Sequence, residues 1–283
     1  MARPKIKLPP MTSLLKPVLI FFVLMYPVCS YACDIVVNQQ EAEVLAEKIW
    51  RNETGGSWDK LVWWNDGEQF ASLGLGHFIW YPTNKTGPFD ESFPKLLKFL
   101  QENNIELPLW LQNNPDCPWQ NKADFLEKNS SPQVKELNEI LKSTWSLQIA
   151  FMLQRLQLSQ TVITQEQANG DSIAQRFCRL VNTPEGRYAL MDYVNFKGEG
   201  TKLEERYKGE GWGLKQVLEN MTDADTAYVD FSKAAEKVLR RRVKNSPPLR
   251  NERRWLNGWI ARVKGYQEEL VPMENTGDAI KIE

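Results

Sequence analysis

The sequence predicts an α+β fold that is mainly helical and contains one small β-hairpin. Two observations carry this prediction. After residue 90 most segments with periodic apolar residues have helical spacing, and capping residues precede several of them. Earlier in the chain, two short apolar runs flank Asn65-Asp66-Gly67, a turn sequence typical of β-hairpins. The 283 residues, 42% of them hydrophobic, leave room for one large domain or for two lobes with a packed core.

The amino terminus has the pattern of a signal peptide. Four basic residues precede an apolar run over residues 18–26, and Ser30-Tyr31-Ala32 fits a cleavage site with small residues. The run is too short to span a bilayer stably. We therefore expect residues 1–32 to be removed during export and the mature protein to be periplasmic or secreted. The remaining chain is weakly acidic, which is not typical of a nucleic-acid binder.

The cysteines leave two alternatives open. Cys33 follows the expected cut, as the lipid-carrying cysteine of a bacterial lipoprotein does, so a lipid anchor at Cys33 is one alternative. Cys117 and Cys178 could form a disulfide in an oxidising compartment. Without lipidation, one thiol of the three would be left over. The sequence does not decide the pairing.

A capped helix should bring Glu53 to its last turn. Asn38 fits an N-cap and Glu41 the N3 position of a capping box, and Gly55-Gly56 should end the helix. The exposed carbonyls of the last turn carry partial negative charge, which raises the pKa of a nearby carboxyl group. Glu53 is therefore a candidate general acid. The alternative is a solvated glutamate at a frayed helix end.

The hairpin that follows carries further polar candidates. Asp66 and Glu68 lie at or beside its turn, and Ser72 precedes Leu73-Gly74-Leu75-Gly76-His77, which we expect to form a glycine-spaced strand. Strand alternation predicts that the Ser72 hydroxyl faces a cleft while Leu73 packs inward. Glycoside hydrolysis uses a protonated carboxylic acid and often a second carboxylate across the scissile bond. This segment supplies both residue types in order.

The ordered set resembles the lysozyme-like superfamily, nearest to its phage-type (endolysin) branch, and the resemblance covers about residues 39–81. It implies a two-lobed domain over residues 33–272. Residues 273–283 lack apolar periodicity and are expected to form a flexible tail. It also implies that Glu53 is the acid and, by counting back from Ser72 without gaps, that Asp66 is the second carboxylate. Ser72 takes the place of the family's threonine. An insertion near residues 56–60 leaves Glu68 as a rival to Asp66.

Beyond the hairpin we expect a series of helices. One should cover residues 94–103, followed by a loop-rich connector over 106–131. Ser131-Pro132 should open a helix, and the helical pattern should continue in some form to about residue 158. Thr164 and Thr183-Pro184 should cap two more helices. Later helices are expected at about residues 213–221, 223–244 and 251–270.

A glycine-rich stretch covers residues 192–200 and 207–218. Its segment Gly213-Leu214-Lys215-Gln216 is similar to an element of lytic transglycosylases that borders their sugar cleft, which implies cleft lining. The alternative is that these glycines are helix C-caps and turns. Glu199 and Glu210 are backup acids.

Other residues have simpler expectations. One or two of the aromatic residues around the motif should touch a ligand, and the others should be core: Trp58, Trp63, Trp64, Trp80 and Tyr81. His77, the single histidine, is expected to be a buried structural residue, with a catalytic base as the alternative. No cofactor or zinc site is expected. A basic cluster should form a solvated helix face or contact an anionic cell-wall polymer: Lys237, Arg240, Arg241, Arg242 and Lys244.

These observations favour an exported, monomeric glycosidase that cleaves the glycan strand of peptidoglycan or a related aminosugar polymer. Glu53 would protonate the glycosidic oxygen, Asp66 or Glu68 would orient water or stabilise positive charge, and Ser72 would help to hold that water. The alternatives are a lytic transglycosylase that uses one acid and a non-catalytic envelope protein that binds glycan or acts as a scaffold.

Overall fold

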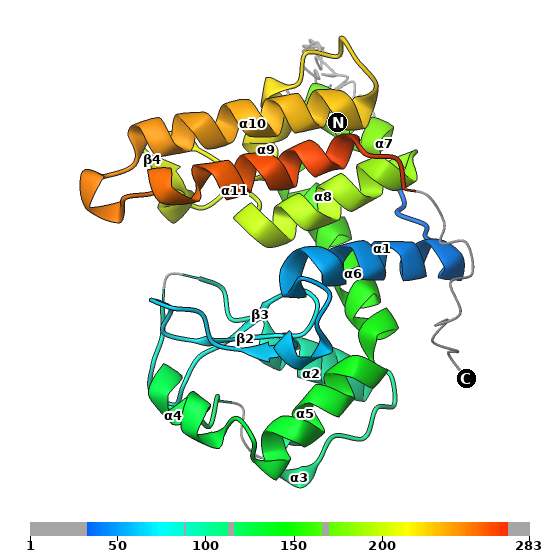
Figure 1. The fold of residues 1–283 in the computed structure, drawn as a ribbon. Helices are drawn as coiled ribbons and strands as arrows, with labels where there is room; N and C mark the ends of the chain where they lie inside the picture. The colour runs from blue at the N-terminus through cyan, green and yellow to red at the C-terminus, as the bar shows by residue number, and fades with distance from the viewer. Residues whose placement is uncertain (1–32, 88, 113–115, 166–169, 271–283) are drawn as a thin grey trace, which may run out of the picture. The chain divides into compact units, whose positions relative to one another are not determined.

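The computed structural model describes residues 33–270, except residue 88 and residues 113–115 and 166–169. The expected signal peptide and tail therefore lie outside the described residues. Helices dominate the described part of the chain, and a small antiparallel sheet follows the first helix (Figure 1). The predicted mainly helical α+β class is confirmed.

The elements are as follows. The helices are α1 (Gln39–Thr54), α2 (Phe93–Glu102), α3 (Leu109–Gln112), α4 (Lys122–Lys128), α5 (Pro132–Ser143), α6 (Trp145–Gln165), α7 (Gly170–Val181), α8 (Pro184–Lys197), α9 (Leu214–Asn220), α10 (Ala227–Asn245) and α11 (Arg253–Lys264). Short 3₁₀ helices are η1 (Trp58–Lys60), η2 (Leu203–Glu205), η3 (Pro248–Arg250) and η4 (Gly265–Gln267). The strands are β1 (Val62–Trp63), β2 (Ala71–Leu73), β3 (Phe78–Trp80), β4 (Arg206–Tyr207) and β5 (Glu210–Gly211).

Helix α1 begins and ends where its capping residues predict. The Asn38 side chain accepts a hydrogen bond from the Glu41 backbone N–H at 2.9 Å. Gly55 adopts the left-handed conformation at φ 65° and donates its N–H to the carbonyl of Arg51. The last turn of α1 therefore contains Glu53, as the sequence predicted.

The predicted hairpin is present and belongs to a three-stranded sheet. Strands β1 and β2 pair antiparallel, with Val62 opposite Leu73, and β3 pairs along the other edge of β2. Gly67 has φ 80° in the turn, and the Glu68 N–H donates to the Asn65 carbonyl. The third strand was not predicted. It makes β2 the central strand of the sheet.

The glycine turn between β2 and β3 is held by two distant helices. The Leu75 N–H donates to the Gln148 side chain of α6 at 2.9 Å, and the Asn195 side chain of α8 donates to the Gly76 carbonyl at 2.9 Å. A Cβ atom on Gly74 would lie 2.4 Å from the Gln148 Oε1 atom. Only glycine allows this approach, so the turn that follows Ser72 is fixed on both α6 and α8.

Aromatic side chains form the core on which the sheet packs. Trp80 of β3 contacts Phe93 and Trp119, and Trp119 in turn contacts Phe125 of α4. All four side chains are buried. Burial of large aromatic surface is a main source of stability in such a core.

Helix α6 links this region to the later helices, since it contacts α1 and α2 as well as α7 and α8. Helix α10 contacts α8, α9 and α11, and Figure 1 shows α10 and α11 side by side. No helix in the described part of the chain combines the length and the apolar character that a membrane span requires.

Three local predictions were wrong. Thr164 does not cap a helix but lies inside α6, where its hydroxyl donates to the Gln160 carbonyl at 2.9 Å. Residues 74–77, expected to continue the glycine-spaced strand, form the turn between β2 and β3. The hairpin of β4 and β5 lies in the glycine-rich stretch, where no strand was expected.

The disulfide joins Cys33 to Cys178, which are 145 residues apart in the sequence. Cys117 is buried and free, so the suggested pairing of Cys117 with Cys178 is wrong. Burial raises the pKa of the Cys117 thiol to about 12, so this thiol is unreactive at neutral pH. A lipid thioether on Cys33 would need the sulfur atom that the disulfide uses, and the lipid-anchor alternative is incompatible with this bond.

Candidate functional site

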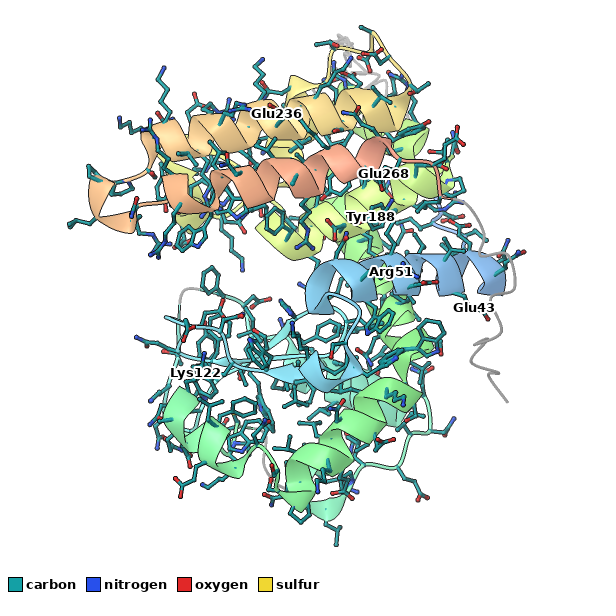
Figure 2. The ribbon with its side chains drawn as sticks, viewed as in Figure 1. Glu43, Arg51, Lys122, Tyr188, Glu236 and Glu268 are labelled. Atoms are coloured by element: carbon teal, nitrogen blue, oxygen red, sulfur yellow. A yellow bond between two sulfur atoms is a disulfide. The ribbon has the colours of Figure 1, made fainter. Side chains whose placement is uncertain are left out.

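The backbone of Glu53 lies in the last turn of α1, but its side chain lies outside the described residues. The neighbouring Asn52 donates to the hydroxyl of Tyr188 on α8. The ammonium nitrogen of Lys48 lies 5.1 Å from the centre of the Tyr188 ring. Figure 2 labels Tyr188 near α1. The end of α1 is thus tied to α8, which fixes the backbone position of Glu53.

Asp66 lies at the hairpin turn and its side chain is 96% exposed. It forms an ion pair with Lys122 at 2.7 Å, and the ammonium group of Lys122, labelled in Figure 2, lies 5.9 Å from the centre of the Trp63 ring. A carboxylate in this setting is solvated and paired with a cation. Asp66 is therefore the weaker of the two hairpin carboxylates as a candidate for catalysis.

Glu68 is half-buried and is the carboxylate that the structure brings to Ser72. Its Oε2 atom accepts hydrogen bonds from the Asn65 side chain at 3.0 Å and from the Ser72 hydroxyl at 3.4 Å. Its backbone carbonyl accepts from the Trp64 indole N–H at 2.9 Å. The loop therefore orients Glu68 from both its main chain and its side chain.

The predicted exposure of Ser72 was wrong. The residue is 3% exposed, and its neighbours Ala71 and Leu73 in β2 are also buried. Successive side chains of a strand alternate between solvent and core only where one face of the sheet is exposed to solvent. All three residues of β2 are buried, so the Ser72 hydroxyl is covered and meets the half-buried Glu68.

His77 occupies the glycine turn in a left-handed conformation, at φ 46°. It is half-buried, whereas the sequence predicted a buried residue. Its backbone N–H donates to the Gly74 carbonyl at 3.4 Å. The backbone conformation of His77 supports a structural role in this turn, next to the segment that Gln148 and Asn195 hold.

The aromatic residues divide into core and surface groups. Trp64, Trp80 and Tyr81 are buried and belong to the core. Trp63 and Trp58 are half-buried, and the ring of Trp58 stacks on that of Trp50 at 4.6 Å between centroids. The half-buried indoles remain the candidates for contact with a sugar ring.

The glycines of the second stretch have a structural explanation. A Cβ atom on Gly213 would lie 2.1 Å from the backbone nitrogen of Gly200. The Gln216 side chain bridges the two segments, accepting from the Gly213 N–H and donating to the Gly200 carbonyl, both at 3.0 Å. This supports the alternative that close backbone packing and turns, rather than a ligand, require these glycines.

The two backup acids also have partners within the protein. Glu199 accepts a hydrogen bond from the hydroxyl of Ser159 on α6 at 2.8 Å. Glu210 is exposed and forms an ion pair with Arg241 at 3.0 Å. Neither is brought to Ser72 or Glu68 by any described contact.

The basic cluster on α10 is not one uniform solvated face. Arg240 pairs with Glu236 on its own helix, while Arg242 pairs with the buried Glu252. Burial raises the pKa of Glu252, but the hydrogen bonds and charge of Arg242 outweigh that effect and hold its pKa below the ordinary value. Part of the basic cluster is therefore structural.

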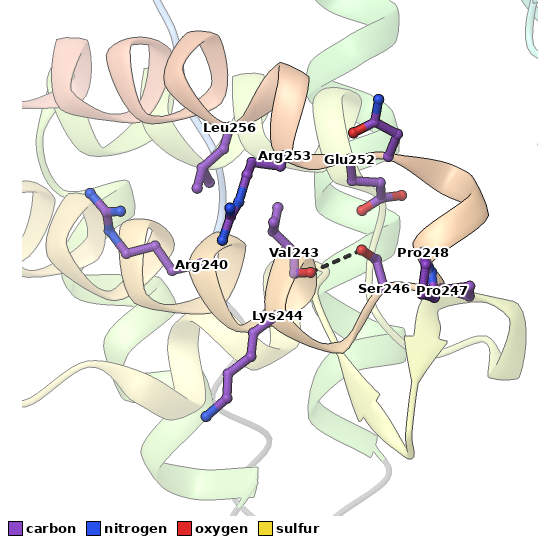
Figure 3. A pocket seen from close by; sticks show the side chains of 10 residues that line it. Arg240, Val243, Lys244, Ser246, Pro247, Pro248, Glu252, Arg253 and Leu256 are labelled. Atoms are coloured by element: carbon purple, nitrogen blue, oxygen red, sulfur yellow. Dashed lines mark hydrogen bonds between the residues drawn. The ribbon is translucent and has the colours of Figure 1, made fainter.

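A pocket of about 680 Å³ lies beside this cluster. Figure 3 shows its lining, with Arg240 and Lys244 from α10 and Arg253 and Leu256 from α11. None of the sequence-predicted catalytic residues lines it. Within the described residues no group of His, Cys, Asp and Glu side chains is arranged to hold a metal ion.

Sequence reasoning missed the residues that position the site. Gln148, Asn195 and Lys122 lie 56 to 119 residues from their partners near the hairpin, and no local pattern marks them.

Comparison of the chain with protein-family models, with curated proteins and with solved structures finds no match.

Proposed function

We propose that this protein is an exported glycosidase that cleaves the glycan strand of peptidoglycan or a related aminosugar polymer. The observation that carries the proposal is the order of elements: a helix whose last turn contains Glu53, then a sheet in whose central strand Ser72 donates a hydrogen bond to Glu68 of the preceding loop. The resemblance of residues 39–81 to the lysozyme-like superfamily supports the same function.

In the proposed mechanism Glu53 protonates the glycosidic oxygen as the bond to the sugar breaks. Glu68 is the second carboxylate, and it orients the attacking water or stabilises positive charge on the sugar ring. The Ser72 hydroxyl donates to Glu68 and so fixes which way that carboxylate points. Asp66 is not given a catalytic part, because it is exposed and paired with Lys122.

The disulfide supports the proposed compartment. Disulfides persist in oxidising compartments such as the periplasm and the extracellular medium and are rare in the cytosol. The bond between Cys33 and Cys178 fits a chain that is exported after removal of residues 1–32.

A lytic transglycosylase is the second candidate, and the setting of the hairpin carboxylates favours it. Asp66 is solvated, and Glu68 is already bound by Asn65 and Ser72. If neither carboxylate reaches the sugar, Glu53 would act alone. A single carboxyl group can first donate its proton to the leaving glycosidic oxygen and then, as a carboxylate, accept the proton of the sugar's own hydroxyl as that oxygen bonds to the anomeric carbon, so that no water is consumed.

Analysis of the products from purified cell wall tests the proposal. The mature protein should release soluble fragments, and hydrolysis should give fragments with a reducing end at the cleaved sugar. Mass spectrometry distinguishes these from anhydro-sugars, which weigh one water less and would establish the transglycosylase. Absence of any soluble fragment, from a folded protein that binds the cell wall, would favour the non-catalytic envelope protein.

Glu68→Gln should lower turnover by at least about tenfold, because the amide cannot accept a proton or balance positive charge. Ser72→Ala should slow turnover less, since it removes one hydrogen bond to that carboxylate. The matched control is Asp66→Asn on the same hairpin, which should keep most of the activity. Turnover on cell-wall glycan is the measurement. A larger loss in Asp66→Asn than in Glu68→Gln would reverse the assignment.

A further inference from the structure

Lys197, the last residue of α8, lies between two aromatic rings. Its ammonium nitrogen is 3.7 Å from the centre of the Phe196 ring and 3.6 Å from that of Trp259 on α11. The side chain is half-buried. Aromatic faces attract a cation but carry no full negative charge. They therefore hold the ammonium group in place without neutralising it.

Two arginines flank this lysine, and each forms an ion pair with a carboxylate, although Arg250 also contacts that of Glu252 at 3.8 Å. Arg262 lies 4.4 Å from the Phe196 ring centre and pairs with Asp192. Arg242 lies 5.0 Å from the Trp259 ring centre and pairs with Glu252.

Lys197 itself forms no ion pair with any residue that the structure describes. Among Lys197, Arg242 and Arg262, Lys197 is therefore the cation that pairs with no described carboxylate. An uncompensated, partly desolvated cation is costly to a fold, and such groups are enriched where proteins bind ligands.

We propose that this cluster, formed by Lys197, Phe196 and Trp259 with Arg242 and Arg262 beside them, is a binding site for an oxyanion. The ligand would carry a carboxylate or a phosphate that accepts hydrogen bonds from the Lys197 ammonium group. Charge-assisted hydrogen bonds of this kind are the strong ones, particularly where aromatic rings reduce access of water.

The site is connected to the glycine turn of the sheet. Asn195, in the same last turn of α8, donates to the Gly76 carbonyl. An oxyanion bound at Lys197 would thus be held by the helix end that anchors the segment after Ser72. This inference concerns binding and does not rest on the proposed cleavage reaction.

Burial, together with the charges of Arg242 and Arg262, holds the pKa of Lys197 well below its ordinary value, although Glu252 opposes this. The groups that face the lysine are acids and guanidinium groups, whose ordinary pKa values lie outside pH 6–9. An oxyanion binds the protonated amine of Lys197 more tightly than the neutral amine. Binding of the oxyanion should therefore weaken as the pH rises through the pKa of Lys197.

The lowered pKa also fixes the sign of the stability effect. Between the folded and unfolded pKa values of Lys197 the folded chain binds fewer protons than the unfolded chain, so stability rises with pH across that window. Below the window the buried charge costs stability. Lys197→Met, which keeps the length of the side chain and removes the charge, should therefore not lower the melting temperature.

Calorimetric titration of the mature protein with three probes tests the inference. N-acetylmuramic acid carries a carboxylate, inorganic phosphate carries the other oxyanion, and N-acetylglucosamine is the neutral control. At least one anion should bind, and Lys197→Met should weaken that binding about tenfold or more. Lys197→Arg should retain part of it. Lys237→Met, which removes an exposed lysine of α10, should change nothing.

The outcomes separate cleanly. Binding of N-acetylmuramic acid identifies a carboxylated ligand, and binding of phosphate alone identifies a phosphorylated one. Equal binding of the neutral sugar, or undiminished anion binding by Lys197→Met, overturns the inference, as does saturable binding of neither anion. If Lys197→Met does not fold, amine labelling of the unaltered protein replaces it. The anion should then protect Lys197, but not Lys237, from trinitrobenzene sulfonate, and equal labelling with and without anion would contradict the site.

Discussion

Replacement of Glu53 by Gln should lower turnover on cell-wall glycan by at least about a hundredfold. The amide preserves the size and shape of the side chain but has no acidic proton to give to the glycosidic oxygen. Positioned general acids contribute about 10²–10⁴ to the rates of such reactions. The end of α1 is fixed by the Gly55 cap and by the bond from Asn52 to Tyr188, so this substitution should leave the fold intact.

A glutamate in a matched structural position provides the control. Glu102 is the last residue of α2, is exposed and pairs only weakly with Lys98 at 3.7 Å. Glu102→Gln should keep full turnover, and both variants should melt within a few degrees of the unaltered protein. Near-normal turnover in Glu53→Gln would rule out Glu53 as the general acid. A parallel loss of turnover and melting temperature would instead identify a structural part for Glu53.

The elements that could be predicted are those whose signals are local. Asn38, Ser131 and Thr183 each accept a hydrogen bond from the first turn of the helix they precede, as their positions in the sequence predicted. A cap of this kind involves residues three positions apart and does not depend on the rest of the fold. Thr164 failed as a cap because a threonine hydroxyl can also bond the carbonyl four residues earlier within a helix.

The candidate site could be predicted only in part, because contacts over long sequence distances decide it. Counting along the hairpin nominated Asp66, yet Lys122 from α4 pairs with it in solvent. Strand alternation predicted a Ser72 hydroxyl that faces a cleft, but all three residues of β2 are buried, and Ser72 is 3% exposed. The partner of Cys178 could not be chosen from spacing either, since Cys33 is 145 residues away.

Asp192→Asn should lower the free energy of unfolding by about 3–5 kcal/mol. The side chain of Asp192 is 1% exposed and binds Arg262 through two hydrogen bonds of 2.8 and 2.7 Å. It also accepts from the hydroxyl of Tyr266 at 2.5 Å. Burial first, and then the charge of Asp192, raise the pKa of Tyr266 well above its ordinary value, so this hydroxyl stays a donor.

The neutral amide would leave the guanidinium group of Arg262 without its counter-charge in a mostly buried position, and it offers one acceptor oxygen in place of two. Denaturant titration should show the loss as a lower midpoint with an unchanged slope.

Asp223→Asn is the control, because Asp223 also binds two arginines but is 41% exposed. Exposed ion pairs contribute about 1 kcal/mol or less. The double variant Asp192→Leu with Arg262→Met should recover most of the loss, since it removes the unpaired charge together with its partner. Equal losses in Asp192→Asn and Asp223→Asn would show that burial of the pair does not set its contribution to the free energy of unfolding.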